Sequence, residues 1–318
     1  MVVRVLLILC LLNFQALGQS ARMDLVKKLF ESKGYLEVIK LLEPVKKDDK
    51  DYDGARYYLG RVAFDQKRLD DAQDFFEEAV EANNKVALYH NWLGNAYGQI
   101  AQNANVFKQG LLAPKMKAAW EKAIELDPTL MDPRQSLVQY YLQAPGFMGG
   151  SVEKAMEMAK QIMAINSAEG HLQMGNIYVH EKKMPEAEKE FTEMVKANPA
   201  YLSGLANFYT RQKQFDKAFA LYEEAIQKNP QDMSSVYQLG KTSAISGERL
   251  ERGDECMKKY LAYSPKQNEP SLAGANMRLA QIIEKKGNKA EAKKFYETAL
   301  KMDASLKEAK EGLQRTSQ

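Results

Sequence analysis

The chain has 318 residues, of which 45% are apolar and 27% are charged, with a formal net charge of +3. This apolar fraction excludes a largely disordered chain, and the mixed charges lack the clustered Lys and Arg of a nucleic-acid-binding surface. The length suffices for one elongated array or for two ordinary domains.

Residues 1–18 have the pattern of a secretory signal peptide. Arg4 supplies the positive charge, residues 5–12 are apolar, and Ala16 and Gly18 are the small residues expected before a cleavage site. The apolar run is too short to cross a bilayer, which takes about 20 residues. We therefore expect a secreted or periplasmic protein that is cleaved after Gly18 and has no membrane span afterwards.

Cleavage would leave Cys256 as the single cysteine of the chain. One cysteine cannot form an internal disulfide, even in an oxidising compartment. We expect its thiol to be packed on a helix, the alternative being a redox-active or intermolecular thiol.

A short pattern recurs along the rest of the chain. A large apolar residue followed by Gly occurs four times in the same context, at Leu59-Gly60, Leu93-Gly94, Met174-Gly175 and Leu239-Gly240. Leu25, Leu59 and Leu93 are 34 residues apart each time. A period of this size predicts stacked units of identical topology.

The pattern resembles the tetratricopeptide repeat, in which Leu-Gly on a first helix is followed by a small residue, an aromatic and another small residue on a second. The second unit has Leu59, Gly60, Ala72, Phe76 and Ala79 at these positions. The resemblance implies an all-α, right-handed α-solenoid of about eight helical hairpins, because neighbouring hairpins must stack to bury their apolar faces. The array is expected over residues 19–304, with units near 19–52, 53–86, 87–130, 131–167, 168–199, 200–230, 231–265 and 266–304, and a C-terminal cap helix and tail at 305–318.

Two insertions interrupt the period, and both resemble insertions of exported bacterial proteins with this repeat. Residues 101–115 lengthen the third unit, either as a longer hairpin turn that folds back on its own unit or as a partner-binding lip. Residues 143–151 lengthen the turn of the fourth unit, where Ser151 is placed to cap the next helix. The first insertion carries the apolar residues Val106, Phe107, Leu111 and Leu112.

Side-chain amides recur at one position of the first helices, which in this family line a concave groove. Two residues after the consensus Leu, the chain has Lys27, Arg61, Asn95, Gln139, Asn176, Asn207, Lys241 and Gln281. An amide both donates and accepts, so it can pair with the main chain of an extended peptide, as in the amide ladders of some family members. A merely solvated groove is the alternative. The predicted peptide-binding residues, expected to face solvent, are Asn91, Asn95, Gln99, Gln135, Gln139, Gln143, Asn176 and Asn207.

Catalysis and cofactor binding have no support in the sequence. His90, His171 and His180 lack the close spacing of a zinc site. We expect an exported scaffold that holds a partner protein or extended peptide in the groove, with no enzyme activity, no metal and no nucleic acid, in an oligomeric state left open. The first alternative is a structural assembly factor of an envelope complex that acts through its insertions and outer face. The second is an enzyme accessory subunit.

Export gives the first testable prediction. The intact mass of the natively produced protein should lack Met1 to Gly18, because the small residues before Gln19 suit signal peptidase. A full-length product that stays in the cytoplasm would contradict it.

Overall fold

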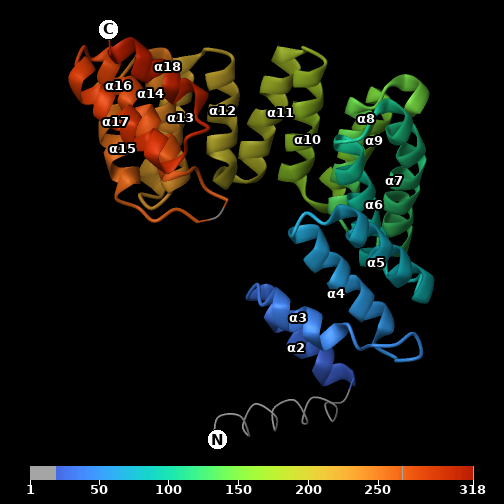
Figure 1. The fold of residues 1–318 in the computed structure, drawn as a ribbon. Coiled ribbons are helices and arrows are strands. Elements are labelled where there is room, and N and C mark those ends of the chain that lie inside the picture. Colours follow the sequence, from blue (N-terminus) through green and yellow to red (C-terminus); the bar gives the residue numbers. More distant parts are fainter. Residues whose placement is uncertain (1–18, 267, 318) are drawn as a thin grey trace, which may run out of the picture. The chain divides into compact units, whose positions relative to one another are not determined.

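A computed structural model describes residues 19–266 and 268–317, and within these ranges the regular structure is entirely helical. The predicted signal peptide lies outside the described residues. Sixteen helices pair in chain order as eight hairpins, and one more helix follows (Figure 1). The all-α repeat architecture expected from the sequence is confirmed.

The chain divides into two compact units, the first of which ends at Asn166 and contains four hairpins. Its helices are α2 (Gln19–Glu31) and α3 (Tyr35–Leu42), α4 (Tyr52–Asp65) and α5 (Leu69–Ala82), α6 (Ala87–Gln102) and α7 (Val106–Leu126), and α8 (Asp132–Gln143) and α9 (Val152–Ile165). The short 3-10 helix η2 (Gly146–Met148) lies between the last two.

The second unit begins at Ser167 and contains the other four hairpins and the final helix. Its helices are α10 (Ser167–His180) and α11 (Met184–Ala197), α12 (Leu202–Arg211) and α13 (Phe215–Lys228), α14 (Met233–Ser246) and α15 (Leu250–Leu261), α16 (Leu272–Lys285) and α17 (Lys289–Met302), and α18 (Lys307–Thr316), with the 3-10 helix η3 (Pro199–Tyr201) before α12. One continuous apolar core runs from Ala168 to Ala309.

Four hairpins have a glycine on the first helix, at Gly60, Gly94, Gly175 and Gly240, that packs closely against a large residue on the second. A Cβ added at Gly60 would lie 2.7 Å from the Phe76 ring, and one at Gly94 would lie 2.6 Å from the Trp120 ring. Contacts that short do not occur, so the two helices could not approach this closely with any larger residue there. The Leu-Gly signal in the sequence is therefore a packing requirement of the hairpin.

The fourth hairpin reverses the two sizes. Val138 on α8 stands where other hairpins have Gly, and Ala159 on α9 stands where they have an aromatic. Both side chains are fully buried. The larger of the two side chains thus comes from the first helix instead of the second.

The final helix closes the second unit by the same device. Gly312 on α18 packs against Tyr296 of α17, where an added Cβ would lie 2.2 Å from the ring. The Arg315 guanidinium donates to Glu284 on α16 at 2.9 Å, and Tyr296 donates to the same carboxylate at 2.6 Å. The predicted cap helix is confirmed.

Adjacent hairpins are tied by a repeated Tyr–Glu hydrogen bond. Tyr97 on α6 donates to Glu77 on α5 at 2.6 Å, and Tyr209 on α12 donates to Glu188 on α11 at 2.8 Å. Burial and the bond to Glu188 raise the pKa of the Tyr209 phenol to about 12, so it remains a donor at neutral pH. The Tyr of the repeat pattern therefore bonds to the hairpin before it.

The insertion in the third hairpin is helical, so the prediction of a longer turn is wrong. α7 spans 21 residues and begins directly after Asn105, whose side chain accepts from the Lys108 backbone N–H at 2.9 Å. Pro114 lies inside the helix and is exposed, so water can bind the Gly110 carbonyl that Pro114 leaves without a donor. The extra residues thus lengthen the second helix at its N-terminal end.

Two smaller expectations are confirmed. Ser151 caps α9, where its side chain accepts from the Lys154 backbone N–H at 3.2 Å. Cys256 is a free, buried thiol on α15, and burial raises its pKa to about 11. A thiol of this kind packs as a small apolar side chain and has little thiolate at neutral pH.

The packing of α13 against α12 gives the second prediction. Ala218 is fully buried, whereas Ala220 on the same helix is exposed. Ala218→Glu should lower stability by about 3–5 kcal/mol, because it buries an unpaired carboxylate. Ala220→Glu is the matched control and should change stability by less than about 0.5 kcal/mol. Thermal unfolding of both variants measures this, and equal melting temperatures would contradict it.

Candidate functional site

Most first helices of successive hairpins contact one another within their unit. In the first unit α4 contacts both α2 and α6, and in the second α14 contacts both α12 and α16 (Figure 1). We call the side of these helices that carries the residue two positions after the consensus Leu the first-helix face. Its residues are Lys27, Arg61, Asn95 and Gln139 in the first unit and Asn176, Asn207, Lys241 and Gln281 in the second.

Two of the predicted amides support the packed aromatic residue of their own hairpin. The Asn95 Oδ1 accepts from the Trp120 indole N–H at 2.9 Å, and the Asn207 Oδ1 accepts from the Tyr222 hydroxyl at 2.8 Å. A buried aromatic with a polar atom needs such a partner. The oxygens of these two amides therefore accept hydrogen bonds within the protein, and only their N–H groups are available to a ligand.

Asn176 stands at the same position in a hairpin whose aromatic residue, Phe191, has no polar atom. It is partly buried, and no described residue forms a hydrogen bond with its side chain. Its amide can therefore use both its donor and its acceptor toward a peptide backbone.

The remaining predicted amides lie in the first unit and differ in exposure. Gln139 and Gln143 are exposed, and the Gln143 amide donates to the Gln139 carbonyl oxygen at 3.3 Å. Gln99 and Gln135 are partly buried. Asn91 is only 1% exposed, and its Oδ1 has no hydrogen-bond partner among the described residues. Asn91 therefore does not face solvent, because its place on α6 turns it into the hairpin.

The first-helix face of the first unit also holds a stacked guanidinium. Arg61 lies over the Trp92 ring at 3.7 Å and over the Phe30 ring at 4.8 Å, and it donates to the Tyr57 hydroxyl at 2.9 Å. Cation–π contacts of this kind hold a cation from two sides. Arg61 is consequently occupied within the protein.

A basic cluster lies on the first-helix face of the second unit. Lys241 on α14 is partly buried and forms no ion pair within 4 Å among the described residues. Burial lowers the pKa of the Lys241 ammonium, the charges of Arg278 on α16 and Arg211 on α12 lower it further, and the Glu308 carboxylate on α18 raises it. Three cations from three helices therefore act on one another near a single carboxylate, an excess of positive charge that suits an anionic ligand.

The final helix already places one carboxylate on this face. Glu308 on α18 accepts from Arg278 at 2.6 and 3.2 Å and from the Gln281 amide at 3.0 Å. The bond from Arg278 lowers the pKa of the Glu308 carboxyl. Arg278 and Gln281 thus show that this face can bind a carboxylate, here that of Glu308.

The sequence offered little to find this cluster. Arg211, Lys241 and Arg278 come from three hairpins, and only Lys241 belongs to the position that was compared between repeats. The recurring amides indicated the first helices as the binding elements, but they gave no indication of Arg211 and Arg278.

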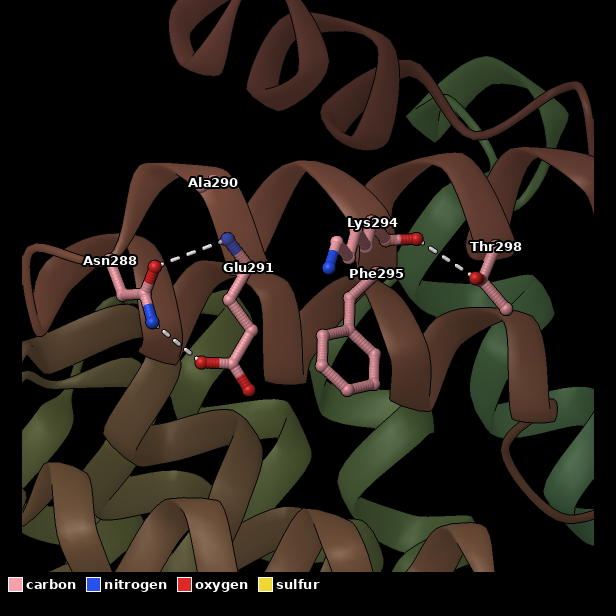
Figure 2. A pocket seen from close by; sticks show the side chains of 6 residues that line it. All are labelled: Asn288, Ala290, Glu291, Lys294, Phe295 and Thr298. Atoms are coloured by element: carbon pink, nitrogen blue, oxygen red, sulfur yellow. Dashed lines mark hydrogen bonds between the residues drawn. The ribbon is translucent and has the colours of Figure 1, made fainter.

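A shallow depression on the second unit is lined by α17 alone and shows no convergent chemistry. Its residues are Asn288, Ala290, Glu291, Lys294, Phe295 and Thr298 (Figure 2). Asn288 caps the helix by accepting from the Glu291 backbone N–H at 3.2 Å, and Thr298 donates to the Lys294 carbonyl at 2.8 Å. These polar groups serve the helix itself.

The described part of the chain has no candidate metal-binding cluster and no candidate membrane-spanning helix. Those residues include no group of three or more His, Cys, Asp or Glu side chains able to hold a metal ion. None of their helices combines the length and the apolar character needed to cross a membrane.

Comparison with known proteins identifies the repeat. Family models described as tetratricopeptide repeat match residues 29–95, 199–232 and 273–306. The chain is a tetratricopeptide repeat protein. Tetratricopeptide repeats are in general non-catalytic protein-interaction modules whose stacked helices form extended binding surfaces.

Comparison with solved structures finds one with a TM-score above 0.5, at low sequence identity. A tetratricopeptide repeat protein from Parabacteroides merdae has a TM-score of 0.52 and 17% identity, over 90% of this chain and all of that one. A tetratricopeptide repeat protein from Thermus thermophilus has a TM-score of 0.43 and 20% identity, over 60% of this chain and 98% of that one. No curated protein matches this tetratricopeptide repeat protein.

The attachment of α18 gives a prediction about pH. The folded-state pKa of Glu308 is lowered, so its stabilising contribution is present above the unfolded value and is lost as pH falls through the folded value. Glu308→Gln should cost about 0.2–1 kcal/mol near pH 7, the range of an exposed ion pair. The difference from the parent should shrink as pH falls through the lowered folded-state pKa of Glu308, because the parent carboxyl then becomes neutral as well. Thermal unfolding of both proteins across this range measures it, and a pH-independent difference would contradict it.

Proposed function

We propose that this protein is an exported scaffold that holds an extended, acidic segment of a partner protein along the first-helix face of its second unit. The observation that carries this proposal is Lys241, a partly buried cation beside Arg211 and Arg278 without an ion pair of its own. Holding a charge in such a place costs desolvation free energy, which a bound carboxylate offsets.

The amides on the neighbouring helices supply the second half of the interaction. Asn176 on α10 has both a donor and an acceptor available, and Asn207 on α12 has its N–H groups. Groups of this kind bind a main chain irrespective of its sequence. The lysine would then select acidic segments, while the amides would hold the backbone.

The N-terminal pattern of Arg4, an apolar run and small residues before Gln19 supports export. The oxidising environment of an envelope or extracellular space is compatible with a chain whose one remaining cysteine is buried.

Assembly of an envelope complex through the insertions, the first alternative, has one observation in its favour. That alternative calls for exposed apolar side chains at the insertions, and Phe107, Leu111 and Phe147 are all exposed. This surface lies on different helices from the basic cluster, so it would be a second contact surface beside the proposed peptide site.

Binding to a random-sequence peptide array tests the proposed function. Peptides rich in Asp and Glu should bind best to the parent protein, because the cluster around Lys241 is cationic. Lys241→Gln should remove this preference. Asn176→Ala should weaken all peptides alike by about two- to tenfold, the loss of one or two hydrogen bonds.

Two further variants complete this prediction. Lys289→Gln removes an exposed lysine from α17 in the same unit and should leave binding unchanged. Asn207→Ala should lower the melting temperature, because the Tyr222 hydroxyl loses its Asn207 acceptor, so it is unsuitable as a binding test on its own. Equal binding of acidic and basic peptides by the parent protein would refute the proposal.

A further inference from the structure

The two insertions of the first unit lie against each other. η2, from the insertion of the fourth hairpin, contacts α7, from that of the third. A Cβ at Gly110 on α7 would lie 3.7 Å from the Met148 methyl group of η2. The Tyr140 hydroxyl donates to the Met148 carbonyl and fixes η2 to α8. The insertions therefore form one surface, which we call the insertion surface.

An apolar stripe runs along the outer side of α7 on this surface. Phe107, Leu111, Pro114 and Ala118 follow one another at spacings of four, three and four residues, and all four are exposed. Such spacings place side chains on one side of a helix. The buried residues of the same helix, Leu112, Met116 and Trp120, occupy the opposite side. α7 is therefore apolar on both its inner and its outer side.

The largest apolar side chains of the insertion surface project into solvent. Phe107 is 77% exposed, Leu111 is 57% exposed, and Phe147 of η2 is 83% exposed. They stand on the convex side of a helix and on the tip of a turn. A protein partner would need a pocket for each of these side chains, whereas the interface of a lipid bilayer accepts protruding apolar side chains of any arrangement.

The charges beside the N-terminal part of the stripe are all positive, whereas Glu121 and Glu125 follow it at the C-terminal end of α7. Residues 103–120 contain Lys108, Lys115 and Lys117 and no acidic residue, and residues 143–151 contain no charged residue. Lys117 is partly neutralised by Glu121 at 3.5 Å, but Lys108 and Lys115 are exposed along one edge of the stripe. In a two-fold contact between copies of this chain, the same lysines would face each other. Their charge instead complements an anionic surface.

We propose that the insertion surface binds the anionic face of a phospholipid bilayer. Phe107, Leu111 and Phe147 enter the boundary between headgroups and acyl chains, and Lys108 and Lys115 pair with lipid phosphates. The arrangement has the two parts of an interfacial amphipathic helix, an apolar side and flanking basic residues. It places the protein on a membrane without crossing it.

Flotation of the natively produced protein with phospholipid vesicles tests this proposal. The protein should float with vesicles of phosphatidylcholine containing one third phosphatidylglycerol, should float weakly with phosphatidylcholine alone, and should dissociate at high salt because the attraction is screened. The double variant Phe107→Ser with Leu111→Ser should bind about tenfold less, as should Lys108→Gln with Lys115→Gln.

The control variants distinguish vesicle binding by the insertion surface from vesicle binding by other parts of the chain. Leu36→Ser removes an apolar side chain that is 59% exposed on α3 and should leave flotation unchanged. All variants share one N-terminus, so residues 1–18 would contribute equally to each. Melting temperatures equal to the parent's verify that the variants fold.

Three results would overturn the proposal. The first is a parent protein that does not float with anionic vesicles, and the second is flotation of both double variants that equals that of the parent. The third is a parent protein that self-associates or binds an acidic amphipathic protein through Phe107 and Leu111 while ignoring the vesicles, which would assign the insertion surface to a protein partner.

Discussion

The close approach of the two helices within each hairpin is the constraint on which the rest of the structure depends. Gly60 and Gly94 leave room for the rings of Phe76 and Trp120, and no larger residue fits at either place. Because each large ring is taken up inside its own hairpin, the outer sides of the first helices are free to carry polar groups. The positions of Asn176, Asn207 and Lys241 follow from that division of each first helix into a packed side and an available side.

Packing and binding share residues on this face. Asn95 and Asn207 accept hydrogen bonds from Trp120 and Tyr222, so an amide that recurs for a structural reason also presents donors to solvent. Arg61 is held by Trp92 and Phe30, and Arg278 by Glu308. Asn176 and Lys241 are the members of the face in the second unit that no such internal bond occupies among the described residues, which is why they carry the proposed function.

The sequence predicted the hairpins well, because Leu-Gly and the small–aromatic–small pattern follow directly from how two helices pack. It failed where local signals opposed the outcome. Gly110, Pro114 and the asparagines near residue 103 indicate a turn, yet burial of Leu112 and Met116 against the hairpin makes the segment helical. Asn91 was expected in solvent because only its spacing from Asn95 was considered. The basic cluster could not be predicted, since Arg211 and Arg278 are far from Lys241 in sequence and meet it only through stacking.

The exchange of sizes between Val138 and Ala159 has a consequence for how such chains diverge. This hairpin combines a larger residue on the first helix with a smaller one on the second, so neither the glycine nor the aromatic residue is indispensable to a hairpin. Successive substitutions at the two positions can therefore carry a hairpin away from the consensus while it remains a pair of packed helices. Such a hairpin departs from the repeat at both positions that define it, yet the two departures offset each other in size.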